Sequence, residues 1–161
     1  MNRYLKILKN QQYVSLLEQL TVLESGRIFC RHDLQHFLDV ARLMYIMALE
    51  QHLSLSKDLI YAAALLHDIG RVQQYTQQLP HNQASAEIAA SVLKDCGYLP
   101  DECRCICKAI LSHRNTDVFP GEEVLSALLY RADKLSRNCF CCQAREDCYW
   151  EETKKNQTVT Y

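Results

Sequence analysis

The chain has 161 residues, of which 48% are hydrophobic, so we expect one folded domain with a real core rather than a disordered chain. Its formal net charge of −1 at pH 7 gives no strong field, so neither nucleic acid nor an anionic membrane is expected as a partner. The longest apolar run, residues 59–66, is far shorter than the roughly 18 residues of a membrane span, and no signal-peptide pattern opens the chain, which predicts a cytoplasmic protein.

Hydrophobic spacing is helical over most of the chain. Apolar residues recur three and four positions apart, β-branched runs are scarce, and only four glycines and three prolines interrupt the pattern. These features predict an all-α domain, a compact bundle of about six main helices. In the first half we expect helices at about residues 3–23, 31–52 and 56–68. Ser56 is placed to cap the N-terminus of the third helix.

The second half continues the helical pattern after a polar, glutamine-rich connector at 71–80. We expect further helices at about residues 84–95, 101–113 and 122–136. Pro100 suits the first turn of the helix that follows it, and a loop at 114–121 separates the last two helices. Residues 138–161 are rich in cysteine and then polar, so we expect an irregular tail that is partly docked on the bundle.

One short stretch stands out at the end of the apolar run: Leu65-Leu66-His67-Asp68-Ile69-Gly70-Arg71. Two adjacent side chains that can both bind a metal follow directly on an apolar helix. Burying an imidazole or a carboxylate without a partner is unfavourable, and a bound cation is a common way to compensate that cost. The glycine of this stretch marks a helix end or a close approach of two backbones.

Six residues of the sequence suit a metal site, and they lie on or beside five different predicted elements. Imidazole and carboxylate are ligands of divalent metals such as Mn, Fe, Ni, Co and Zn. The six candidate ligands are His36, His67, Asp68, His81, His113 and Asp133. Spacing alone does not show that they converge.

The order of these residues resembles the HD superfamily of metal-dependent phosphohydrolases. Five pieces match in order: His36-Phe37-Leu38-Asp39-Val40-Ala41, the stretch 65–71, His81 with Ser85-Ala86 after it, Ile110-Leu111-Ser112-His113, and Ala132-Asp133-Lys134-Leu135. The matching core spans about residues 29–137. We therefore interpret residues 1–161 as a single domain of this type. Its last part, residues 138–161, is the cysteine-rich tail.

The resemblance implies a helical bundle with a metal site at its centre and about two divalent metal ions per chain. His36, His67, Asp68 and Asp133 would hold one metal. Asp68 would bridge to a second metal, which His81 and His113 would complete. Because charge develops on the phosphoryl group during such chemistry, nearby cations are needed, and three lie within a few residues of proposed ligands. We predict catalytic roles for Asp68, Arg71, Arg114 and Lys134.

Departures from the family pattern narrow the range of substrate classes that we expect. Members that cleave cyclic dinucleotides usually carry a His-His pair and a Gly-Tyr-Pro element, and alarmone hydrolases have a different neighbourhood around the His-Asp pair. This chain has Ser112-His113-Arg114 and no Gly-Tyr-Pro element. The remaining branch cleaves phosphomonoesters or phosphoanhydrides of small metabolites and nucleotides. Two alternatives stay open: a metal-containing nucleotide-binding module with little turnover, and oxygenase chemistry at a di-iron site. The partner expected is a small phosphorylated substrate, and a homodimer is left open.

The nine cysteines and one further histidine, His32, allow more than one interpretation. Nine cysteines without a signal peptide favour reduced thiols. Cys139, Cys142 and Cys148 have a ligand-like spacing that could form a small structural zinc site, but an incomplete one, and free cysteines also serve as small apolar residues. His32 shares a helix face with His36. It could contact the substrate or a metal ligand, or it could have only a surface or capping role, and the sequence leaves both open.

Overall fold

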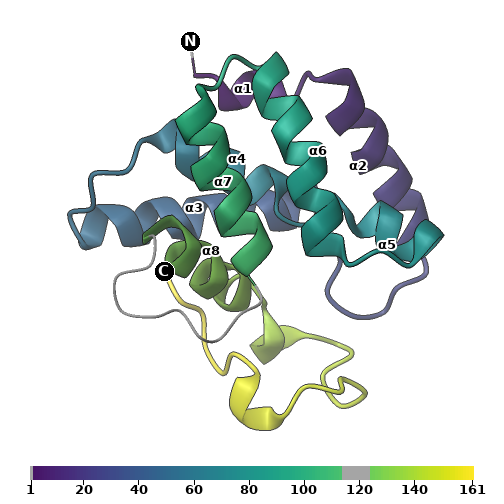
Figure 1. Ribbon diagram of the computed structural model, residues 1–161. Helices are drawn as coiled ribbons and strands as arrows, with labels where there is room; N and C mark the ends of the chain where they lie inside the picture. Colours follow the sequence, from purple (N-terminus) through teal and green to yellow (C-terminus); the bar gives the residue numbers. More distant parts are fainter. Residues whose placement is uncertain (1, 114–123) are drawn as a thin grey trace.

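The computed structural model describes residues 2–113 and 124–161, and the regular secondary structure of this part is all helical, as predicted. Figure 1 shows helices packed side by side around a central pair, with an irregular tail below them. The α-helices are α1 (Tyr4–Ile7), α2 (Gln11–Leu23), α3 (Leu34–Glu50), α4 (Lys57–Leu66), α5 (Arg71–Gln77), α6 (His81–Asp95), α7 (Pro100–Ser112) and α8 (Val124–Leu135). In this described part no helix is long and apolar enough to cross a membrane.

Capping residues explain where several helices begin. Asn10, Asp33 and Ser56 each place a side-chain oxygen on a backbone N–H of the first turn of α2, α3 and α4. The prediction of one helix over residues 3–23 is wrong, because Asn10 adopts an extended backbone and starts a new helix after the short α1. The cap at Ser56 is confirmed, since its Oγ accepts from the N–H of Leu59 at 3.2 Å.

The core lies along α3 and α4, which pack on each other at the centre of the molecule. Every residue of α4 from Ala62 to Leu66 is buried, which agrees with the apolar run seen in the sequence. Helices α6 and α7 pack against each other and against α4, while α8 packs on α3 and α7. The C-terminal end of α4 therefore opens into the middle of the bundle, where α3, α6, α7 and α8 surround it.

The segment after the His-Asp pair is a helix, not the polar connector predicted for 71–80. Helix α5 follows Gly70 and ends at Gln77, and the next residue, Gln78, is a left-handed C-cap with a φ of 58°. Val72 is its one buried residue, so hydrophobic spacing gave little sign of it. The next helix also begins earlier than expected, at His81 rather than near residue 84, with Pro80 as its N-cap. This early start places His81 in a first helical turn.

Gly70 lets the backbone after α4 touch the start of α6. A Cβ built on Gly70 would lie 2.6 Å from the carbonyl oxygen of His81, and it would also meet the backbone of Ser85 and Ala84. The Gly70 N–H donates to Ser85 Oγ at 2.8 Å, and both residues are buried. The close approach suggested by the sequence is confirmed, and it holds His81 beside the His-Asp pair.

The tail is irregular, as predicted, apart from two 3-10 turns at Cys139–Cys141 and Glu152–Lys154. Asn156 fixes it to the end of α8, because its amide donates to the carbonyl oxygens of Lys134 at 2.9 Å and Arg137 at 2.7 Å. In Figure 1 the tail loops out below α8, and its C-terminal end returns to the bundle beside α8.

Candidate metal centre

The six predicted ligands come together from five parts of the fold. His36 lies in the first turn of α3, where its N–H bonds the Asp33 cap at 2.9 Å. His67 and Asp68 follow directly on α4, and His113 follows directly on α7. His81 is the first residue of α6, and Asp133 lies in the last turn of α8. Two groups result in the described residues, each with ligand atoms within 4.8 Å of one another: His36 with His67, Asp68 and Asp133, and Asp68 with His81 and His113.

The first group faces the Asp133 carboxylate. Asp133 Oδ1 lies 3.5 Å from His36 Nε2 and 3.8 Å from His67 Nε2. His67 Nε2 is also 3.6 Å from Asp68 Oδ2. These separations are too long for good hydrogen bonds and leave room for one ion between the donors, since divalent metals bind such atoms at about 2.0–2.2 Å.

The second group shares Asp68 through its other oxygen. Asp68 Oδ1 lies 3.2 Å from His81 Nε2 and 3.5 Å from His113 Nε2. The two oxygens of one carboxylate thus point to two different groups of imidazoles. This is the arrangement expected of a carboxylate that bridges two metals.

Backbone carbonyls hold two of the imidazoles in the orientation that a ligand needs. His67 Nδ1 donates to Ala64 O at 2.8 Å, and His113 Nδ1 donates to Ile110 O at 2.6 Å. A proton on Nδ1 leaves the Nε2 lone pair directed to the centre of the site. Within residues 2–113 and 124–161, the buried atoms His36 Nε2, His67 Nε2 and Asp68 Oδ1 make no hydrogen bond. Such buried, unsatisfied acceptors fit a site built for cations.

The protonation of these groups also suits metal binding. Burial lowers the pKa of His36 to about 3, with help from the nearby His67, so this imidazole is neutral at ordinary pH. Burial opposes the charge on Asp68, but His67 and Arg71 outweigh it and hold the pKa of that carboxyl well below its usual range. Burial lowers the pKa of His67, yet the charges of Asp68 and Asp133 reverse the shift and raise it.

A second network, not predicted from the sequence, supports the site from the side of α2. Glu24 is 3% exposed, and its carboxylate accepts from the His32 N–H, His32 Nδ1 and Tyr75 Oη, each at 2.7 Å. This fixes His32 so that its Nε2 lies 3.6 Å from Asp68 Oδ2. His32 is therefore a buried neighbour of a metal-site residue, not a surface or capping histidine. Its spacing of four from His36 was the one sequence signal for this network.

Stability should depend on Glu24 in a defined range of pH. Burial alone would raise the pKa of Glu24. The hydrogen bonds and the charge of His32 have the larger combined effect and lower this pKa from 4.5 to about 2. A depressed carboxyl pKa stabilises the fold above the unfolded value and loses that contribution as pH falls through the folded value. We expect Glu24→Gln to lower the free energy of unfolding by about 1–3 kcal/mol at neutral pH. Urea unfolding should show this gap shrinking as pH falls from 4.5 towards 2.

The exposed Glu18→Gln on α2 is the matched control for that experiment. It should unfold like the wild-type protein at each pH. A gap between wild type and Glu24→Gln that stays constant down to pH 2 would contradict the assignment of the depressed pKa to Glu24.

A cavity of about 500 Å³ opens over the candidate metal centre and is lined by basic and aromatic side chains. Arg71 Nε donates to Asp68 Oδ2 at 3.0 Å, and Lys134 Nζ donates to Asp133 Oδ2 at 2.6 Å. Arg137, which was not predicted, lies 3.7 Å from Asp133 Oδ2 and 3.8 Å from the centre of the Trp150 ring. Its position four residues after Asp133 could have indicated this contact. Arg114 was also predicted to act here, but it lies outside the described residues.

The chain belongs to the HD domain family, whose model matches residues 33–138. An uncharacterized protein of Clostridium beijerinckii is 40% identical over the full length of both chains. The ribonuclease Y of Syntrophobacter fumaroxidans is 35% identical over 75% of this chain, which spans 21% of that relative. The crystal structure of a predicted HD superfamily hydrolase from an uncultured Thermotogales bacterium has a TM-score of 0.66 at 24% identity, covering 90% of this chain and 80% of the other. That structure shows the shared fold.

Proposed function

We propose that this protein is a metal-dependent hydrolase that cleaves a phosphomonoester or phosphoanhydride of a small metabolite or nucleotide. One observation carries the proposal: the two oxygens of the Asp68 carboxylate face two groups of imidazoles at the floor of a cavity lined by cations. Membership of the HD domain family supports it. A cytoplasmic location and the absence of a nucleic-acid partner belong to the same proposal and rest on the sequence.

The donor set fits divalent metals such as Mn, Fe, Co, Ni and Zn, because it combines imidazoles with carboxylates and leaves buried acceptors without a partner. His36, His67, Asp68 and Asp133 would hold one ion, and His81 and His113 would complete a second around Asp68. When bound, such ions lower the pKa of coordinated water, which supplies a nucleophile near neutral pH.

Each cation over the site has a separate task in this proposal. Arg71 orients Asp68 through Nε, and its remaining N–H groups can bind a phosphoryl oxygen in a forked geometry. Lys134 and Arg137 place positive charge beside Asp133, where charge would develop on the phosphoryl group. His32, held at Nδ1 by Glu24, presents Nε2 to the same space and can hydrogen-bond the leaving oxygen.

Aromatic residues in the cavity wall favour a substrate with a flat ring. Tyr75, Tyr149 and Trp150 line the cavity together with Phe29 and the basic groups. Rings of this kind can stack on a nucleobase while arginine and lysine hold phosphate. A nucleotide is therefore the first substrate to test.

The likeness to ribonuclease Y adds a second substrate class, the phosphodiesters of RNA. This chain covers about a fifth of the length of those relatives, and its net charge of −1 gives no overall attraction to a polynucleotide. Together with the aromatic and basic lining of the cavity, this favours small nucleotides over long RNA.

Hydrolysis of a substrate panel tests the proposal. Metal-free protein reloaded separately with Mn, Fe, Co, Ni or Zn would be incubated with nucleoside mono-, di- and triphosphates, sugar phosphates and a short oligoribonucleotide. We expect metal-dependent release of phosphate from at least one small ester or anhydride. Tight nucleotide binding without turnover would instead support the binding module, and oxygen consumption by the iron-loaded protein without phosphate release would support an oxygenase.

A further inference from the structure

Four of the nine cysteines gather where the tail meets the segment before α3. Cys139 and Cys142 form a Cys-x2-Cys pair around the first 3-10 turn of the tail, and Cys148 follows six residues later. Cys30 lies more than a hundred residues earlier in the chain, two residues before His32. All four are free thiols in the structure.

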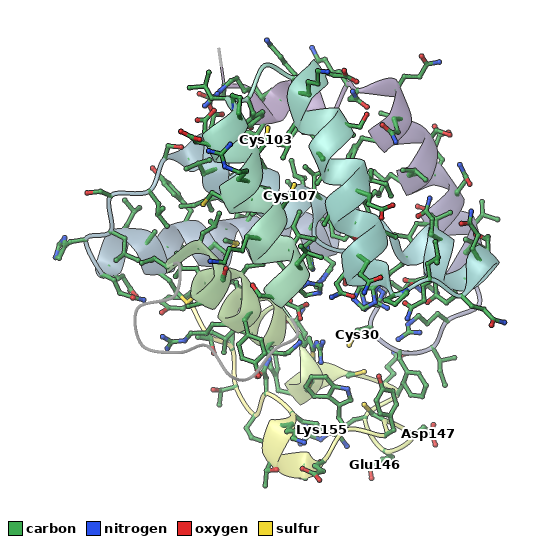
Figure 2. All side chains as sticks on the ribbon, viewed as in Figure 1. Cys30, Cys103, Cys107, Glu146, Asp147 and Lys155 are labelled. Atoms are coloured by element: carbon green, nitrogen blue, oxygen red, sulfur yellow. The ribbon has the colours of Figure 1, made fainter. Side chains whose placement is uncertain are left out.

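Shared surroundings place these four residues together. Cys30, Cys139 and Cys148 line the cavity over the candidate metal centre, and Cys30 and Cys139 line an adjoining hollow with Cys141 and Cys142. Partial desolvation raises the pKa of the Cys30 thiol, and Cys139 and Cys142 are near enough to add to this shift, which Arg137 opposes. Figure 2 shows Cys30 at the boundary between bundle and tail, whereas Cys103 and Cys107 lie on α7, away from the tail.

Apolar packing gives the tail little support beyond the hydrogen bonds of Asn156 to the end of α8. In the described residues 136–161, Ala144 is the one buried residue, and the large side chains Phe140 and Tyr149 are 40% and 77% exposed. A segment of this size without a core is usually held by disulfides or a structural metal. The Cys-x2-Cys turn, with the Cys142 N–H bonded to Cys139 O at 3.3 Å, is the type of turn that presents two thiolates to zinc.

We propose that Cys30, Cys139, Cys142 and Cys148 bind one zinc ion as thiolates, separately from the histidine and aspartate centre. In the described residues, the groups of three or more ligands within 4.8 Å of one another both belong to that centre, so the four thiols must close around the ion. Each thiol releases a proton to solvent as its sulfur binds, and closure orders the tail, because metal binding and local folding are coupled.

Neighbouring Cys141 is excluded from the ligand set and serves as an internal control. Its Sγ donates to Asn138 O at 3.6 Å, and it lies between the two cysteines of the Cys-x2-Cys pair. The proposed zinc site has a consequence for the cavity, since the tail carries Tyr149 and Trp150 in the cavity wall. Zinc would tie this wall to the segment that carries Cys30 and His32.

Cobalt absorption distinguishes the thiolate site from the histidine and aspartate centre. Full-length protein, purified under reducing conditions and stripped of metal, would be titrated with Co²⁺ and then with Zn²⁺. We expect intense thiolate-to-cobalt charge-transfer absorption in wild type, Cys141→Ser and His67→Ala, with loss of that absorption on adding zinc. Cys30→Ser and Cys142→Ser should lose it, and their zinc content should fall by about one ion per chain.

Two further measurements keep the test decisive. Circular dichroism should show unchanged helix content in the serine variants, because the four thiols lie outside the α-helices of the bundle. In the wild type, zinc should protect Cys30, Cys139, Cys142 and Cys148 from alkylation, as read from peptide masses. Absence of the charge-transfer absorption in reduced wild type, or its full retention in Cys30→Ser, would overturn the proposal.

Discussion

Replacing Asp68 with asparagine should remove both metals and lower metal-dependent kcat/KM by at least ~10²-fold. Asp68 is the one residue common to both groups of ligands, with Oδ1 facing His81 and His113 and Oδ2 facing His67. A neutral amide has one acceptor oxygen, so it cannot bridge two ions. Elemental analysis and hydrolysis of the best substrate from the panel would measure the two losses.

Asp39→Asn is the control for this substitution. Asp39 lies on the same helix as His36, but its carboxylate contacts Gln35 and Arg42 at the surface. We expect wild-type metal content and turnover from this variant. An Asp68→Asn protein that keeps both ions and full activity would contradict the bridging role.

Gly70→Ala should lower the free energy of unfolding by about 1–3 kcal/mol, because the new methyl group meets backbone atoms of α6 that cannot rotate away. Relief of this clash requires α6 to move from the turn after α4. The motion should draw His81 from Asp68 and weaken the second metal more than the first. Urea unfolding and metal titration would measure the two effects.

Gly26→Ala provides a matched comparison, because a Cβ at Gly26 meets nothing within 4 Å. Its free energy of unfolding should stay within about 0.5 kcal/mol of wild type. If Gly70→Ala were as stable as Gly26→Ala and bound metal equally well, the close contact between Gly70 and α6 would not position His81.

Much of the fold was predictable because the helices are marked locally. The all-α class, the buried run that becomes α4 and the cap at Ser56 follow from spacing and capping chemistry that nearby residues determine. Helix α5 was not predictable in this way. It buries only Val72, so it depends on packing against α2 and α6, which appears only after the chain has folded.

The metal centre shows the same limit. The pattern predicted which residues would meet, and the structure brings all six together, although their role as metal ligands stays a prediction. The contact of Gly70 with Ser85 Oγ, which sets His81 beside Asp68, required tertiary structure. Glu24 and Arg137 were missed because neither belongs to a motif, and their effects depend on His32 and Trp150 being brought near them.

The most direct test of the central claim is the metal content of the purified chain, compared between wild type and His81→Ala. Elemental analysis would be made after reloading with a single metal and correcting for any cysteine-bound zinc. Two ions per chain in wild type and about one in His81→Ala are expected from the two groups around Asp68. One ion in both proteins would contradict a dinuclear site and remove His81 from the ligand set.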